Sequence, residues 1–170
     1  DHMRQFTTVP AAGPLLDRYR RDGVTTEESI GTFFARAASR NPWLPAVRQG
    51  GQRFTYRQVL DQVERLASWM AGQGVRPGAV VTWQLPNWWE ASVDEYAIWH
   101  AGAVSNPVLP ICREHELRHI LGELESDVVI VPRTFRDCDH VALFESVLAD
   151  AGVRPAARLV VRGSAAGWTS

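Results

Sequence analysis

Short apolar runs rich in β-branched residues alternate with helical segments over the second half of the sequence. The run Val128–Val131 is apolar at every position, which is typical of a strand buried on both faces of a parallel sheet. Strands of this kind, joined by helical crossovers, form a parallel sheet that helices cover on both sides. We therefore expect an α/β fold with three layers, in which helices flank a mostly parallel sheet.

Helix-capping signals mark where several of these elements begin. Thr55 and Gln58 match a capping box, in which each side chain accepts a hydrogen bond from the other residue's backbone amide. Asn87 and Glu90 repeat this spacing, and Asp139 is a third candidate cap. The expected strands are residues 80–85, 104–109, 128–131 and 158–161, and the expected helices begin at residues 30, 56, 88, 114 and 140.

The chain divides into three segments. Residues 1–29 show no clear period and are expected to form an arm, of which residues 1–2 resemble a cloning scar. The span 30–162 holds the predicted α/β elements, including a small β-hairpin over residues 46–55 with two glycines at its turn. Residues 163–170 are rich in small side chains, which indicates a linker.

The composition excludes several functions, because all 18 residues counted as lysine plus arginine are arginine. A chain without lysine has no Walker lysine, no pyridoxal Schiff base and no lysine nucleophile. A net charge of −1 gives no attraction to nucleic acid, and no apolar run reaches the roughly 18–20 residues of a membrane span. Cys112 and Cys138 have no partner motif, so we expect free thiols and a cytoplasmic location.

The segment His115–His119 matches the H-E-x-x-H pattern of zinc metalloproteases, in which two histidines on one helix face share a metal. Here the apolar side of the expected helix is centred near Leu117 and Leu121. At about 100° per residue, both histidines fall about 160–200° away from Leu117. We therefore interpret them as part of a solvated face and expect no metal site.

Three arginines lie where expected strands end. Arg133 and Arg136 follow the strand 128–131, and Arg113 follows the strand 104–109. Ligands of open parallel sheets bind beyond the carboxyl ends of the strands, and arginine is suited to phosphate. The alternative interpretation is a solvated rim without a ligand.

Seven tryptophans are many for 170 residues. Most large aromatic side chains are buried in a core or in an interface. Trp88 and Trp89 are adjacent and point apart, so we expect one of them to be exposed or to cover a partner surface. We also expect self-association into a homo-oligomer, with Trp88, Trp89 or Trp168 in the contact or exposed.

Five segments in a fixed order resemble the amino-terminal region of acyl-CoA synthetases and their adenylate-forming relatives. They are Phe54-Thr55-Tyr56-Arg57-Gln58-Val59-Leu60, Gly74-Val75-Arg76-Pro77-Gly78, Leu85-Pro86-Asn87, Ala101-Gly102-Ala103-Val104 with Pro107, and Glu116-Leu117. Within this family, the runs 83–90, 106–111 and 131–136 look similar to cyclohexanecarboxylate-CoA ligases and to short- or medium-chain fatty-acid-CoA ligases.

The resemblance implies a two-step ligase reaction in the full-length protein. A small carboxylic acid and ATP, with Mg²⁺, give an acyl-adenylate, and CoA then displaces AMP to give a thioester. The family's nucleotide loop and its catalytic lysine do not occur in this sequence. We therefore expect a truncated amino-terminal lobe that is inactive alone, contains no catalytic residue and holds no ATP, Mg²⁺ or CoA by itself.

The resemblance also implies a role for the arginines at the strand ends. In the full-length ligase, Arg133, Arg136 and, with a weaker match, Arg113 are expected to approach the nucleotide of CoA. The competing interpretation of the whole chain is a non-catalytic α/β module that binds a protein partner through Trp88 or Trp89.

Overall fold

A computed structural model describes residues 13–25 and 28–170. The proposed cloning scar, residues 1–2, lies outside the described residues. Four parallel strands form the central sheet in the order β4-β3-β5-β8. Their bounds are Val104–Pro107 for β4, Val80–Trp83 for β3, Val128–Pro132 for β5 and Ala157–Val161 for β8. The expected parallel sheet is therefore confirmed.

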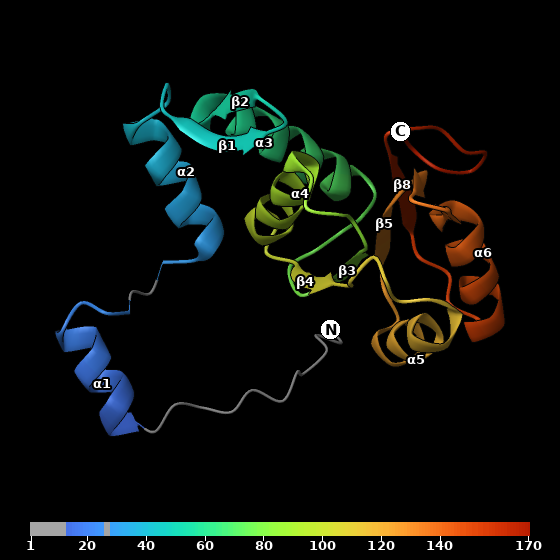
Figure 1. Cartoon of the computed structure of the whole chain (residues 1–170). Helices are drawn as coiled ribbons and strands as arrows, with labels where there is room; N and C mark the ends of the chain where they lie inside the picture. The colour runs from blue at the N-terminus through green and yellow to red at the C-terminus, as the bar shows by residue number, and fades with distance from the viewer. Residues whose placement is uncertain (1–12, 26–27) are drawn as a thin grey trace.

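Helices cover both faces of this sheet, as Figure 1 shows. The pair α3 and α4 lies on one side, and the pair α5 and α6 lies on the other. Their bounds are Tyr56–Gly72 for α3, Trp89–His100 for α4, Glu114–Leu124 for α5 and His140–Ala151 for α6. The three-layer α/β architecture predicted from the sequence is thus the one observed.

Strand β5 shows how the sheet separates two cores. Val128 and Ile130 pack into the apolar cluster beneath α3 and α4, whereas Val129 and Val131 pack into the cluster beneath α5 and α6. This alternation is the period of two that a pleated strand imposes on its side chains. All five residues of β5, Val128–Pro132, are buried, which explains why the sequence of this strand is apolar throughout.

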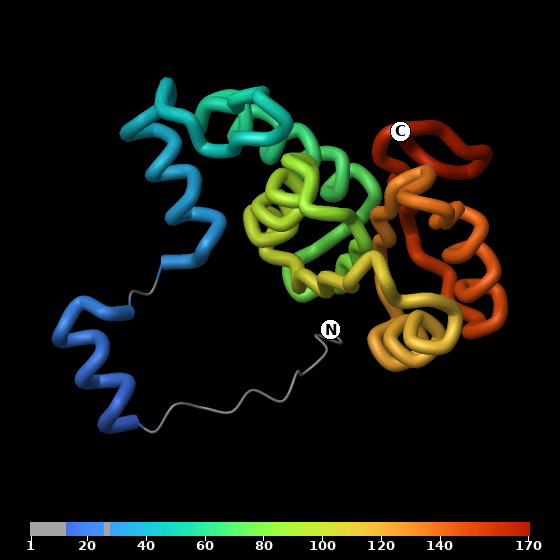
Figure 2. The backbone as a smooth tube through the Cα atoms, viewed as in Figure 1, coloured from blue at the N-terminus to red at the C-terminus, as the bar shows by residue number. Residues whose placement is uncertain are grey.

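The smaller elements lie at the margins of the sheet. The tube in Figure 2 shows α1 standing apart from the rest of the chain, and none of its residues is buried. The expected hairpin is formed by β1 and β2, and a second, unexpected hairpin is formed by β6 and β7. The bounds are Gly13–Arg21 for α1, Ile30–Arg40 for α2, Pro45–Gln49 for β1, Gln52–Thr55 for β2, Thr134–Phe135 for β6 and Cys138–Asp139 for β7.

Two of the three predicted helix caps are confirmed. The Thr55 hydroxyl accepts from the Gln58 amide at 3.3 Å, and the Gln58 side chain accepts from the Thr55 amide at 2.9 Å. Asp139 accepts from the amide of Ala142 at 3.0 Å and caps α6. The box at Asn87 is wrong, because α4 begins one residue later with Trp88 as a cap that has no side-chain hydrogen bond.

The spacing of Ile30, Phe33, Phe34 and Ala37 predicts the helix α2 but does not identify its buried face. Ile30 and Phe33 are 53% and 56% exposed, whereas Gly31, Phe34 and Ala38 are buried. Phe34 stacks on Tyr96 of α4 with ring centroids 3.9 Å apart. The buried face of α2 is therefore centred on Gly31, Phe34 and Ala38. Because Gly31 has no side chain, α2 can approach the backbone of α4 closely.

The last residues pack back on the sheet instead of extending away from it. Trp168 is 8% exposed, and its indole nitrogen donates to Glu145 of α6 at 3.0 Å. Thr169 pairs with Leu159 of β8 in a parallel bridge. Although residues 163–170 have the composition of a linker, they are held by these contacts.

We predict that Gly31→Ala destabilises the fold. A Cβ at this position would meet the backbone of His100 in α4 at 2.9 Å, and backbone atoms cannot yield cheaply. The free energy of unfolding in urea should fall by about 1–3 kcal/mol. The matched control is Gly122→Ala in α5, where a Cβ meets nothing within 4 Å and alanine should add about 0.5–1 kcal/mol. Equal effects at both glycines would contradict the close crossing of α2 and α4.

Candidate functional site

A pocket lies at the edge of the sheet where strands β3, β4 and β5 end. Its volume is about 390 Å³. Pro86 and Asn87 follow β3, the turn Leu109–Arg113 follows β4, and Phe135 and Arg136 follow β5. The carboxyl ends of parallel strands meet at one edge, which is the place where open α/β sheets bind ligands.

The lining of this pocket combines apolar walls with two cations. Pro110 and Phe135 belong to the apolar part, together with Leu109 and Ile111, which remain 70% and 75% exposed. Most apolar side chains of this size are buried in a folded domain. An anion with an apolar body therefore suits the pocket better than a small polar solute does.

The structure separates the three arginines that the sequence singled out. Arg113 and Arg136 line the same pocket, although 22 residues lie between them in the chain. Arg133 does not line it. Its guanidinium forms an ion pair with Asp139, the cap of α6, and its side chain fills the space in which Gly163 would carry a Cβ.

Arg113 is held by its own turn. Its guanidinium donates to the carbonyl oxygens of Pro110 at 2.7 Å and Cys112 at 2.9 Å. Its backbone amide donates to the carboxylate of Glu116 at 2.9 Å, and this hydrogen bond lowers the pKa of Glu116. Since guanidinium has five donors in a planar fork, Arg113 keeps donors for a ligand.

Arg136 sits at the tip of the β6–β7 hairpin. Its backbone is left-handed, with φ of 52°, a conformation that is uncommon for residues other than glycine. The guanidinium carbon lies 5.4 Å from the centroid of the Phe135 ring. The hairpin thus presents an aromatic ring and a cation together at the mouth of the pocket.

A buried polar chain lies behind the pocket. The side chain of Gln84, at the end of β3, donates to the carbonyl oxygens of Leu109 at 2.8 Å and Cys112 at 3.2 Å. Its amide oxygen lies 2.8 Å from Nδ1 of His140, the first residue of α6. Both Gln84 and His140 are fully buried. Burial lowers the pKa of His140, the charge of Arg113 lowers it further, and Asp139 opposes the shift.

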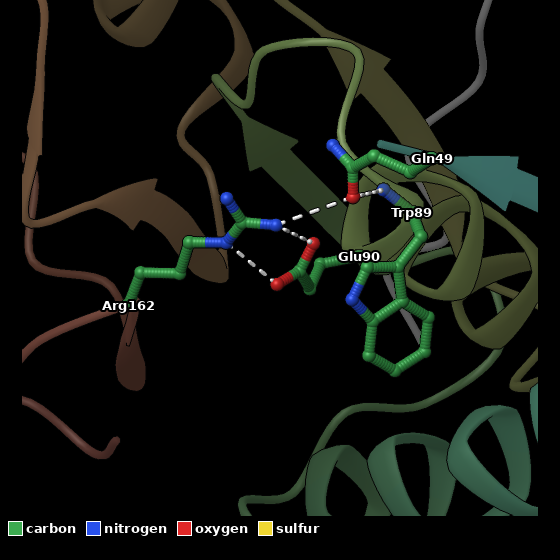
Figure 3. A network of polar contacts seen from close by, with 4 residues as sticks. All are labelled: Gln49, Trp89, Glu90 and Arg162. Atoms are coloured by element: carbon green, nitrogen blue, oxygen red, sulfur yellow. Dashed lines mark hydrogen bonds and ion pairs between the residues drawn. The ribbon is translucent and has the colours of Figure 1, made fainter. Parts of the chain in front are cut away.

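A second network fixes the loop between β3 and α4. In Figure 3, Arg162 reaches the carboxylate of Glu90, with donor–acceptor distances of 2.8 and 3.0 Å. The amide oxygen of Gln49 accepts from Arg162 at 3.3 Å and from the backbone amide of Trp89 at 3.2 Å. Gln49, which belongs to β1, thereby binds the amide of Trp89 at the start of α4, one residue before the Glu90 amide that Asn87 was expected to bind.

The tryptophan predictions need correction. Trp88 is half-buried, with Arg162 3.9 Å from its ring centroid and Phe135 at its edge. Trp89 is also half-buried and stacks on Phe54 at 4.3 Å. Neither indole is exposed, because residues from distant parts of the chain pack against both rings. Trp168 is buried as well. The exposed tryptophan is Trp43, with 79% of its surface accessible.

The H-E-x-x-H segment lies as the helical period predicts. His115 and His119 are exposed on α5, while Leu117 and Leu121 are fully buried. Among residues 13–25 and 28–170, no three histidine, cysteine, aspartate or glutamate side chains gather as metal ligands would. No helix in the described part of the chain is long and apolar enough to cross a membrane.

Sequence reasoning missed the buried carboxyl group of Asp94. It is 3% exposed in the middle of α4, and its Oδ2 atom has no hydrogen-bond partner among the described residues. Burial raises the pKa of Asp94 well above its usual value, and the charge of Glu90 raises it further. Its helical spacing to the buried residues Ala97 and Ile98 is the signal that could have revealed it.

A parallel sheet between two helical layers, with an arginine-bearing pocket at its carboxyl edge, is the architecture of α/β ligand-binding domains. The model of the family "AMP-binding enzyme" matches residues 34–169, and the chain belongs to that family of adenylate-forming ligases. It resembles the amino-terminal region of these enzymes.

Similar proteins agree with this assignment. A salicylyl-CoA synthase from a Streptomyces species is 34% identical over 84% of this chain and 26% of its own length. A medium-chain fatty-acid–CoA ligase from Escherichia coli is 31% identical over 74% of this chain and 22% of its own length. The apo structure of MbtA from Mycobacterium smegmatis superposes with a TM-score of 0.80 and 29% identity, over 95% of this chain and 29% of its own. The chain thus spans about a quarter of the length of these relatives.

We predict that Asp94→Asn stabilises the fold in a pH-dependent way. Because its pKa is raised in the folded state, Asp94 keeps its proton to a higher pH than the unfolded carboxyl does, so stability falls as pH rises above the ordinary value of 3.8. The neutral amide removes this loss, by on the order of 1 kcal/mol near pH 7. Urea unfolding from pH 4 to pH 8 should therefore show a widening advantage for the variant. The control Glu64→Gln changes an exposed carboxyl of α3, and an advantage independent of pH would contradict the assignment.

Proposed function

We propose that the chain is the amino-terminal lobe of an ATP-dependent carboxylate–CoA ligase. In the first step a carboxylate oxygen attacks the α-phosphorus of ATP and pyrophosphate leaves. In the second step the CoA thiolate attacks the acyl carbon and AMP leaves. The observation that carries the proposal is the pocket lined by Arg113 and Arg136, in a chain that belongs to the adenylate-forming family.

Within that reaction, we assign the pocket to the nucleotide part of CoA. Guanidinium groups bind phosphate with paired hydrogen bonds, and the apolar wall of Leu109 and Ile111 suits an adenine ring or the pantetheine arm. Arg133 is withdrawn from this role because Asp139 already holds its guanidinium. The proposed phosphate ligands are therefore Arg113 and Arg136.

The other substrates belong to the rest of such a ligase. We place ATP and Mg²⁺ in the parts of the relatives that this chain does not span. The carboxylate stays a prediction: the resemblance in sequence points to cyclohexanecarboxylate or a short- or medium-chain fatty acid, and the relatives include salicylate and medium-chain fatty-acid ligases. Two free cysteines and substrates such as ATP and CoA suit the cytoplasm.

The competing function, a protein-interaction module that binds through Trp88 or Trp89, has less support. Both indoles are half-buried against partners within the chain. A ligand pocket at the carboxyl edge of the sheet has no role in such a module, whereas the ligase proposal uses it.

From the sequence we expected no CoA on this lobe alone, but the pocket that joins Arg113 and Arg136 leads us to predict that CoA binds this chain there. In NMR titrations, CoA should shift the signals of Asn87, Ile111 and the arginine side chains, and dephospho-CoA should bind more weakly. Arg113→Ala and Arg136→Ala should each weaken binding about tenfold, because each removes a charge-assisted hydrogen bond. The control Arg118→Ala changes an α5 arginine that pairs with Asp150 instead. Binding that is insensitive to both pocket variants would refute the site.

We also predict that the chain alone catalyses no carboxylate-dependent exchange between ATP and pyrophosphate. The sequence contains no lysine and no nucleotide loop of the family type. Radiolabelled pyrophosphate should not enter ATP with salicylate, octanoate or cyclohexanecarboxylate. Exchange above background that co-purifies with the chain through two chromatographic steps would show that it holds a complete adenylation site.

A further inference from the structure

The turn after β4 carries Ile111 and Arg113 into the pocket. The Cys112 amide donates to the Leu109 carbonyl at 3.0 Å, which closes the turn. Leu109 and Ile111 have no apolar cover, since both are more than two-thirds exposed. Arg113 adds two hydrogen bonds within the turn, and Val108 and Cys112 at its ends pack against the core. From the body of the domain, the side chain of Gln84 bonds both ends of the turn.

Gln84 uses the whole of its amide in this position. The two protons of its nitrogen are directed at the carbonyl oxygens of Leu109 and Cys112, the two ends of the turn. Its oxygen is left to accept one hydrogen bond, which Nδ1 of His140 donates at 2.8 Å. If the Gln84 amide were flipped by 180°, its oxygen would face the carbonyl oxygens of Leu109 and Cys112, which cannot donate to it. The proton on Nδ1 of His140 therefore selects the orientation in which Gln84 holds the turn.

The hydrogen bond from His140 to Gln84 leaves the other ring nitrogen of His140 buried and, within the described part of the chain, without a partner. With the proton on Nδ1, the Nε2 atom is an acceptor only, and it is buried without a hydrogen-bond partner among the described residues. A buried polar atom without a partner costs free energy, and an apolar side chain would avoid that cost. A histidine at this place is therefore explained by its bond to Gln84 and not by packing.

We propose that Gln84 and His140 are positioning residues of the pocket: together they hold the 109–113 turn so that Arg113 and Ile111 face the ligand. The identity of that ligand as CoA rests on the function proposed above, whereas the fixing of the turn does not. The two residues lie 56 positions apart, with Gln84 directly after β3 and His140 at the start of α6, so the pocket depends on the packing of α6 against the sheet.

The test uses three variants of the chain and two measurements. His140→Leu removes the donor and the unpartnered nitrogen together, His140→Asn keeps a donor near the position of Nδ1, and Gln84→Leu removes the bonds to the turn. Amide hydrogen exchange by NMR reports on the turn through Cys112. Urea unfolding reports on the whole fold.

We expect the protection of the Cys112 amide and the free energy of unfolding to change independently of each other. His140→Leu should fold with unfolding stability equal to or above that of the parent, yet lower the protection of the Cys112 amide about tenfold, the size of one net hydrogen bond. His140→Asn should restore that protection. Gln84→Leu should lower it at least as far, and if this variant does not fold, the two histidine variants decide the matter alone.

The proposal is overturned if His140→Leu keeps parental protection at Cys112, or if protection falls only in step with unfolding stability in all variants. The CoA titration is scored separately on the same proteins. A parent chain that does not bind CoA, with the protection pattern as expected, would remove the CoA assignment and leave the positioning role. Binding by the parent that drops about tenfold in His140→Leu and returns in His140→Asn would support both.

Discussion

The burial of β5 on both faces is the constraint on which the rest of the domain depends. Its side chains enter two separate apolar clusters, so helices must cover both sides of the sheet. Parallel neighbours on both edges of β5 then require helical crossovers, which bring each chain segment back to start at the same end. As a result, the connections that leave β3, β4 and β5 gather at one edge, and this edge carries the pocket.

Polar contacts between distant segments give that edge its shape. Arg162 ties the end of β8 to Glu90 at the start of α4 and to Gln49 of the first hairpin, which sets the loop containing Asn87. In the interior of the protein, Gln84 and His140 hold the 109–113 turn, which forms another wall of the pocket. The apolar layers thus determine where the pocket lies, and these two networks determine which side chains line it.

The sequence was sufficient for features that local chemistry determines. The apolar strand at 128–131, the capping box at Thr55 and the cap at Asp139 all lie where they were predicted, because their signals involve residues within a few positions of one another. The cap predicted at Asn87 is wrong, and the buried face of α2 could not be predicted, for the opposite reason. The amide at the start of α4 is bound by Gln49, 40 positions away, and the face of α2 is set by its contact with α4. Arg133 and Arg136 both follow β5 in the sequence, and tertiary contacts separate them, because Arg133 pairs with Asp139 and packs against Gly163 while Arg136 lies at the hairpin tip.

We propose that Arg113 and Arg136 together form a phosphate site for CoA in the lobe of an adenylate-forming ligase. The most direct test is a crystal structure of the chain with CoA bound. We predict phosphate oxygens within hydrogen-bond distance of both guanidinium groups, with the remainder of CoA along Leu109 and Ile111, and the ion pair of Arg133 and Asp139 intact. CoA phosphates on Arg133, or on a surface away from the carboxyl edge of the sheet, would contradict the account.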